Sequence, residues 1–96
     1  MSDDRHPDAG FTLEELCAAA ALEREWLVRR VQDGLIPMVG AVMAEWRFTS
    51  AHLARARRMR EIERTYDAVP ELAALVADMI EEMEALRARL RRAGQR

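Results

Sequence analysis

Helix-start signals are concentrated between residues 11 and 16, and they constrain the fold more than any other feature of the chain. Thr12 can cap the first free backbone N–H groups, and Glu15, three residues later, completes a capping box. Phe11 before the cap and Leu16 after it have the spacing of a hydrophobic staple. These signals predict a helix over residues 13–20. Its expected buried positions are Leu13, Leu16 and Cys17.

A second short helix is predicted over residues 23–33. Gly34 ends it, because glycine readily adopts the left-handed conformation that closes a helix. Its apolar residues share one face: Leu22, Trp26, Leu27 and Val31. Two short amphipathic helices joined by a tight turn are typical of helix-turn-helix geometry.

The next segment, residues 34–48, is predicted to form a small β-hairpin, or wing. The run Gly34-Leu35-Ile36-Pro37 leads out of the second helix into a short strand. The alternation of polar and apolar residues in Glu45-Trp46-Arg47-Phe48 suits the returning strand.

A third helix, capped by Thr49 or Ser50, is expected to run to about Tyr66. Its inward positions are Leu53, Ala56, Met59, Ile62 and Tyr66. Its outward positions carry Arg55, Arg57, Arg58, Arg60 and Arg64. Asp67 and Pro70 then interrupt the chain and start a fourth helix.

The fourth helix carries an apolar seam with heptad spacing. Its members, spaced 4, 3, 4, 3 and 4 residues apart, are Leu72, Val76, Met79, Met83, Leu86 and Leu90. A seam of about three heptads predicts a homodimer. Leu75 and Ile80 widen the stripe, so the helix is also expected to touch its own domain. Glu82 and Arg87 are complementary in a parallel pair, and an antiparallel pair fits the seam equally well.

The chain has 96 residues and a mass of 11.0 kDa, which predicts one small domain with a helical extension. Half of the residues are hydrophobic, a composition that argues against disorder. The longest apolar run, residues 18–22, is too short to cross a bilayer, and no signal-peptide pattern opens the chain. One cysteine cannot form an internal disulfide. We therefore expect a cytoplasmic protein that makes no membrane contact.

Groups that could carry catalysis are scarce. The histidines are His6 and His52, and Cys17 is expected on the buried face of the first helix. Cys17 and His52 lack the paired spacing of metal ligands, so the interpretation of Cys17 as a small buried hydrophobe is favoured. The four glycines are scattered singly, so they form no phosphate-binding loop. We expect neither an enzyme nor a bound metal or cofactor.

Three motifs resemble the helix-turn-helix and wing of MerR-like domains: Phe11-Thr12-Leu13-Glu14-Glu15-Leu16-Cys17, Gly34-Leu35-Ile36 and Trp46-Arg47-Phe48. With the Arg-rich third helix and the acid-dotted last helix, they resemble more closely the CbpM family of chaperone modulators. The resemblance covers about residues 10–92. It implies a mainly α, winged helix-turn-helix domain over residues 11–66, a flexible tail over 1–10 and a dimerising helix over 67–96. One departure is Asp67-Ala68-Val69-Pro70-Glu71, where a more glycine-like turn is expected.

The resemblance implies a regulator that binds the J-domain of a CbpA-type co-chaperone and restrains its action with an Hsp70-type chaperone. J-domains present a basic helix there, which an acidic partner would complement. Residues 1–50 contain nine acids and five arginines, whereas residues 51–96 contain eight acids and ten arginines. The candidate partner-binding residues are Glu14, Glu15, Glu23, Glu25, Trp26, Asp33 and Trp46. Each tryptophan is a candidate anchor, although its interpretation as a core residue is favoured.

A DNA-binding transcriptional regulator is the alternative that a MerR-like fold predicts. The second helix would read bases, with Arg29, Arg30 and Arg47 near the phosphates. Three acids of that helix cancel its three arginines, and the pI of 5.7 lies below the basic values typical of DNA-binding domains. The arginines of the third helix either grip phosphates or pair with Glu61, Glu63 and the acids of the fourth helix.

Overall fold

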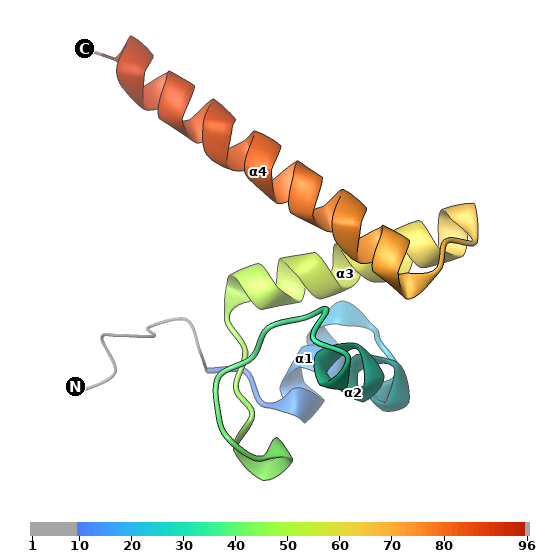
Figure 1. Ribbon diagram of the computed structural model, residues 1–96. Helices are drawn as coiled ribbons and strands as arrows, with labels where there is room; N and C mark the ends of the chain where they lie inside the picture. The colour runs from blue at the N-terminus through green and yellow to red at the C-terminus, as the bar shows by residue number, and fades with distance from the viewer. Residues whose placement is uncertain (1–9, 96) are drawn as a thin grey trace, which may run out of the picture.

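The computed structural model describes residues 10–95, which are mainly α-helical (Figure 1). The elements in chain order are α1 (Leu13–Ala20), α2 (Arg24–Gln32), the short 3-10 helix η2 (Met43–Glu45), α3 (Ser50–Tyr66) and α4 (Pro70–Gly94). Helix α3 lies between α4 on one side and the α1–α2 pair on the other (Figure 1). The predicted tail lies outside the described residues, except for Gly10.

Local signals set the bounds of the first two helices. The capping box is confirmed: the Glu15 backbone N–H donates to Thr12 Oγ1 at 3.1 Å, and the Thr12 N–H donates to Glu15 Oε1 at 2.9 Å. Gly34 has a φ of +77°, so it supplies the left-handed turn predicted after α2. Helices α1 and α2 pack on each other across a three-residue turn, which is the helix-turn-helix arrangement.

The predicted hairpin wing is wrong, because the described residues contain no strand. The segment forms only two isolated antiparallel bridges, Phe11 with Phe48 and Val39 with Arg47. Between Val39 and Arg47 the backbone bonds locally instead of across a ladder: the Glu45 N–H donates to the Val42 carbonyl at 2.8 Å. Gly40 allows this close turn, since a Cβ at that position would lie 2.5 Å from the Glu45 carbonyl oxygen. We call residues 41–45 the loop tip.

The core lies where α1, α2, α3 and the loop before α3 meet. Its largest fully buried side chains are Phe48, Leu16, Leu27, Ile36 and Met59. Trp46 is 6% exposed and meets Phe48 edge-on, with ring centroids 6.5 Å apart. The loop therefore contributes aromatic residues to the core even though it forms no sheet.

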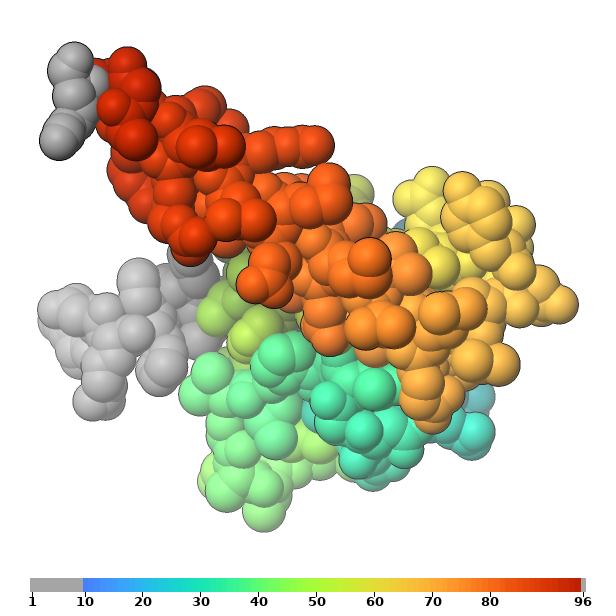
Figure 2. Space-filling view, turned by 45° about the horizontal axis from the view of Figure 1, so that its top comes forward, coloured from blue at the N-terminus to red at the C-terminus, as the bar shows by residue number. Residues whose placement is uncertain are grey.

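Helix α4 packs on α3 through small residues. Ala73, Ala74 and Ala77 are buried in this contact, so the two helices approach closely. The turn between them uses Asp67 in the left-handed region, with a φ of 52°, where a glycine-like residue was expected. Beyond this contact the C-terminal part of α4 extends away from the rest of the molecule (Figure 2).

Two side chains of α3 lie opposite to their predicted positions. Tyr66 was expected inward but is 74% exposed, because it is the last residue of α3 and lies beyond the core. Arg55 was expected outward but is buried. It is buried because α4 crosses α3 at this point and supplies partners for the guanidinium group.

Arg55 joins three segments of the chain. Its Nη1 lies 2.8 Å from Asp78 Oδ1 and 3.0 Å from Glu81 Oε2 on α4. Its Nε donates to the Leu35 carbonyl at 2.9 Å, in the loop that follows α2. Its Nη2 donates a longer hydrogen bond, 3.5 Å, to the Ala74 carbonyl. Each of the three nitrogens of this buried guanidinium therefore has an acceptor, which offsets the cost of burying its charge.

Replacing Arg55 by alanine is expected to lower the free energy of unfolding by about 2–3 kcal/mol, because two carbonyls and two carboxylates lose their shared donor. Urea unfolding followed by circular dichroism measures the change. The control is Arg57→Ala, which removes the same charge from an exposed position and is expected to cost no more than about 0.5 kcal/mol. Equal losses in the two variants would contradict a joining role for Arg55.

Candidate partner-binding surface

The predicted acidic residues of α1 and α2 are all exposed, but they differ in what they contact. Glu14 Oε2 accepts from Arg24 Nε at 3.4 Å, and Glu23 Oε1 accepts from Arg60 Nη2 at the same distance. Glu15 serves the capping box. Within residues 10–95, Glu25 and Asp33 form no ion pair, so their charges are available to a partner.

Most arginines that could grip phosphates are held by carboxylates of the same chain. Arg30 pairs with Glu63 at 2.9 Å, and Arg58 pairs with Glu84 at 3.2 Å. The other paired arginines are Arg24, Arg55 and Arg60. The pairing interpretation of the α3 arginines is thus confirmed for Arg55 and Arg58, whose partners lie on α4. These pairs lower the positive potential that α2 and the first half of α3 can offer to DNA.

A half-buried cluster around Glu63 ties α2 to α3. Both Glu63 oxygens accept from Arg30, through Nε and Nη2, each at 2.9 Å. Trp26 Nε1 also donates to Glu63 Oε1 at 2.9 Å. The guanidinium groups of Arg30 and Arg60 lie over the Trp26 ring, 4.9 and 5.8 Å from its centroid. Trp26 therefore helps to hold α2 against α3, and only part of its side chain is exposed to solvent.

The environment of Glu63 favours its charged form. Burial alone would raise the pKa of Glu63, but hydrogen bonds from Arg30 and Trp26 and the charges of Arg30 and Arg60 lower this pKa below its ordinary value of 4.5. The carboxylate accordingly contributes stability that is present above the ordinary pKa and is lost as the pH falls below it.

The two tryptophans that sequence analysis named together are placed in different settings. Trp46 is in the core, as its alternative interpretation expected, so it offers a partner almost no surface. Trp26 lies on the α3 side of α2, away from the loop tip. The structure therefore does not bring the two predicted anchors into one patch.

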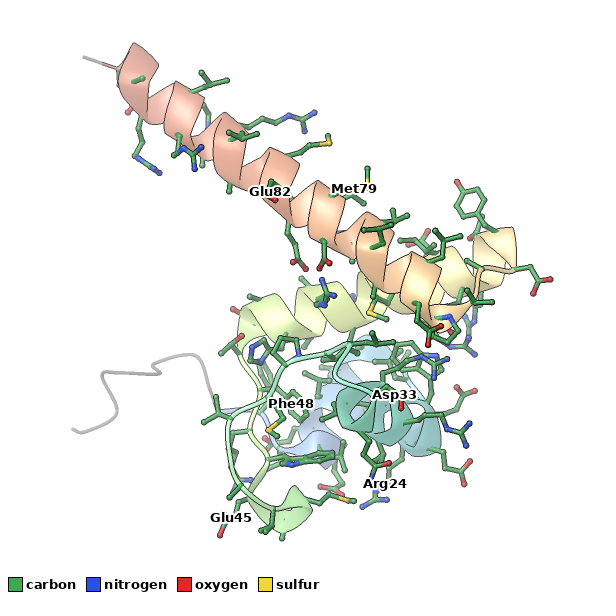
Figure 3. All side chains as sticks on the ribbon, viewed as in Figure 1. Arg24, Asp33, Glu45, Phe48, Met79 and Glu82 are labelled. Atoms are coloured by element: carbon green, nitrogen blue, oxygen red, sulfur yellow. The ribbon has the colours of Figure 1, made fainter. Side chains whose placement is uncertain are left out.

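The loop tip is a surface feature that sequence analysis missed. Val42 and Met43 are exposed there, at 54% and 37%, and Glu45 lies at its outer edge (Figure 3). Next to it is a cavity of about 340 Å³ between the loop tip, the start of α1 and the start of α2. Residues 33–46 contain no arginine, lysine or histidine, but they include Asp33 and Glu45. This absence of basic residues can be seen in the sequence, and it could have indicated that the loop tip is not a basic surface.

The seam of α4 faces away from α3 over most of its length. Leu72, Met79, Met83, Leu86 and Leu90 are all exposed, with Leu90 at 71%, while Val76 is half-buried. Figure 3 shows Met79 on the side of α4 turned away from α3. A row of large apolar side chains along one helix is the kind of exposed patch that marks an interaction site.

In the described part of the chain, the histidine, cysteine and acidic side chains are not arranged as a metal site or a reactive-thiol site. Residues 10–95 hold no group of three or more histidine, cysteine or acidic residues placed to bind a metal ion. Burial, together with the charge of Glu14, raises the pKa of the Cys17 thiol. His52 Nδ1 accepts from the Thr49 N–H at 3.1 Å and so completes the cap of α3. Within the same residues, no helix is both long and apolar enough to span a bilayer.

Comparison with known families agrees with the helix-turn-helix arrangement. The sequence profile of the MerR HTH family of regulatory proteins matches residues 11–95, from the capping box to the end of α4. This chain belongs to the MerR helix-turn-helix family. Searches of the curated proteins and of the solved structures gave no match. The match shows the MerR family alone, so the closer resemblance to CbpM modulators stays a prediction.

Replacing Glu63 by glutamine is expected to destabilise this MerR-family protein by about 1–3 kcal/mol at neutral pH, because the charged hydrogen bonds from Arg30 are lost. Since the pKa of Glu63 is lowered in the folded protein, the difference from the wild type should shrink as the pH falls below 4.5. Urea unfolding at several pH values measures this. A difference that stays constant with pH would exclude a titrating role for Glu63.

Proposed function

We propose that this protein is a non-enzymatic chaperone modulator that binds the J-domain of a CbpA-type co-chaperone and restrains its work with an Hsp70-type chaperone. One observation carries the proposal: in a helix-turn-helix scaffold, the loop tip presents Val42, Met43 and Glu45 where a DNA-binding wing needs cations, and the one basic residue of segment 34–48 is the half-buried Arg47. The MerR family, the acidic residues of α1 and α2 and the motifs shared with CbpM proteins support it.

The proposed contact surface consists of the exposed acids of α1 and α2 together with the loop tip. Glu14, Glu25 and Glu45 would face the basic helix of the J-domain, while Val42 and Met43 would bury apolar area. Electrostatic complementarity speeds the encounter and excludes wrong partners, and apolar contacts supply most of the affinity. The cavity of about 340 Å³ beside the loop tip could accept one apolar side chain of the partner.

Some of the predicted partner-binding residues fit this surface better than others. Glu15 serves mainly the capping box, so its replacement would also weaken α1. Glu23 must first leave Arg60 to pair with a partner, but the distance of 3.4 Å and its exposure make this exchange inexpensive. Trp46 is omitted from the proposed surface because it lies in the core.

DNA binding is the second candidate function, and membership of a family of helix-turn-helix regulators favours it. Arg29 is exposed on α2 and, within residues 10–95, forms no ion pair, so it could reach a phosphate or a base edge. Glu25 and Asp33 on the same helix would then approach the phosphates as well, at an electrostatic cost.

Charge reversal tests the proposed surface. The double variant Glu14→Lys, Glu25→Lys is expected to weaken J-domain binding about tenfold or more in calorimetry, because like charges would then meet across the interface. Glu71→Lys is the matched control, since Glu71 is exposed at the start of α4, away from the loop tip. Unchanged affinity in the double variant would refute this surface.

A comparison of ligands separates the two candidate functions. The wild-type protein is titrated with a J-domain and, in parallel, with random duplex DNA over a range of salt concentrations. We expect J-domain binding and no retention of DNA at moderate salt, because few arginines of α2 and α3 are available. Retention of DNA with a steep salt dependence, and no J-domain binding, would favour the transcriptional regulator.

We also propose that the protein is a homodimer formed by the seam of α4. The exposed apolar side chains from Leu72 to Leu90 would be buried against a second copy. The spacing of the seam is the same when read in either direction, so parallel and antiparallel pairs remain equally consistent with it.

The variant Met83→Glu is expected to shift the protein from dimer to monomer at low micromolar concentration, because it places two charges in the centre of the seam. Analytical ultracentrifugation measures the change. The matched control is Ala85→Glu, which adds the same charge outside the seam of the same helix and is expected to leave the dimer intact. A wild-type protein that sediments as a monomer would remove the proposal.

A further inference from the structure

A second charged site lies at the other end of α3, away from the loop tip. An open cavity of about 390 Å³ is formed between residues 20–22, in the turn that joins α1 to α2, and the second half of α3. Its volume is within the range of about 300–1,000 Å³ that is typical of small-molecule sites. Helix α3 contributes Arg57, Arg60, Glu61, Arg64 and Thr65 to its lining. We call it the arginine cavity.

The arginine cavity keeps a net positive charge, although Arg60 pairs with Glu23 at 3.4 Å. Arg57 and Arg64 are exposed and form no ion pair within residues 10–95. Glu61 is the one acid in the lining, against three guanidinium groups. This distinguishes the cavity from the rest of α2 and α3, where most arginines are paired with carboxylates.

Arg60 has a buried donor with no partner. Its Nε is inaccessible to solvent and forms no hydrogen bond within the described part of the chain. Its Nη2 makes one long contact, 3.4 Å, with Glu23 Oε1. A buried N–H that lacks an acceptor is costly, and such a group in a native protein often indicates a water or an ion.

The charge of the cavity lining determines the class of ligand. Three guanidinium groups against one carboxylate favour an oxyanion over a neutral ligand.

We propose that the arginine cavity binds a phosphate group, either as inorganic phosphate or as the phosphate of a small ester. Guanidinium groups match phosphate because planar N–H donors can contact two oxygens at once, and a doubly charged group suits three arginines better than one carboxylate does. Thr65 offers a hydroxyl donor. The site is linked to the acidic surface of α1 and α2 through the Arg60–Glu23 pair, whereas no residue of α4 lines it.

Binding of phosphate would alter the contacts of Arg60. The Arg60 guanidinium lies 5.8 Å from the centroid of the Trp26 ring and pairs with Glu23. A phosphate that attracts this guanidinium would weaken its contact with Glu23 and change the surroundings of Trp26. Trp26 therefore reports on the site, and Trp46, buried in the core, is the internal reference.

The full chain labelled with nitrogen-15 is titrated with inorganic phosphate and, separately, with adenosine monophosphate, at constant pH and ionic strength. We expect the Trp26 indole and Arg60 Nε–H signals to shift until they saturate, while the Trp46 indole stays in place. Phosphate alone saturating the shifts would identify the free ion as the ligand, and tighter binding of the monophosphate would identify an ester. Shifts that do not saturate, or that sodium chloride reproduces, would overturn the proposal.

Substitutions of opposite sign complete the test. Arg57→Gln and Arg64→Gln are expected to weaken phosphate binding about tenfold each, whereas Glu61→Gln should strengthen it by removing the repelling charge. Arg29→Gln removes one positive charge from α2, outside the cavity, and should leave the affinity unchanged. These positions are exposed, so folding should be kept, as the dispersion of the amide signals will show. Equal losses in Arg29→Gln and Arg57→Gln would reduce the effect to net charge and contradict the site.

Discussion

The ion pairs between arginines and carboxylates on different helices determine much of this structure. Arg55 joins α3 to α4 and to the loop after α2, and Arg30 with Trp26 joins α2 to α3 through Glu63. A chain of 96 residues has a small core, so these bridges complement modest apolar burial. A guanidinium that is occupied within the protein also contributes less to any phosphate-binding surface.

The distribution of the remaining charge separates three surfaces. The loop tip and the first turn of α1 are acidic and apolar, with Arg24 of α2 beside them; the seam of α4 is apolar, and the arginine cavity is basic. In a DNA-binding winged helix, basic residues would be expected on the reading helix and on the wing. Among the arginines of residues 10–66, those that form no ion pair are instead spread over α2, the loop before α3 and α3 itself: Arg29, Arg47, Arg57 and Arg64.

Features that depend on neighbouring residues were predictable from the sequence. The capping box of Thr12 and Glu15, the left-handed Gly34 and the start of α4 at Pro70 involve groups within four residues of each other, and all three predictions are confirmed. The hairpin was not predictable in this way, because alternation in residues 45–48 also suits a single extended segment that sends Trp46 and Phe48 into the core. Over residues 42–46 the backbone forms local 3-10 hydrogen bonds instead of hydrogen bonds between two strands.

The candidate site was only partly predictable, for a related reason. Exposure of the acids on α1 and α2 follows from helical periodicity, but their pairing depends on residues far away in the chain. The carboxylates that pair with Arg55, Arg30 and Arg60 lie between 23 and 37 positions from them, so only the packing of the helices decides which arginines remain available. The burial of Arg55 could not be inferred from α3 alone, since α4 creates it.

Because α4 is one continuous helix, it sets the distance between its contact with α3 and its own C-terminal end. After Glu84, whose carboxylate reaches Arg58, ten more helical residues extend over about 15 Å without support from α3. In a two-copy assembly this unsupported part of α4 would act as a rigid helical spacer between the two helix-turn-helix units. Each inserted residue would lengthen the helix by about 1.5 Å and rotate the residues beyond it by about 100°. Length and orientation are therefore coupled, and only insertions close to a whole number of turns, such as about 7, 11 or 18 residues, would keep the two units facing as before.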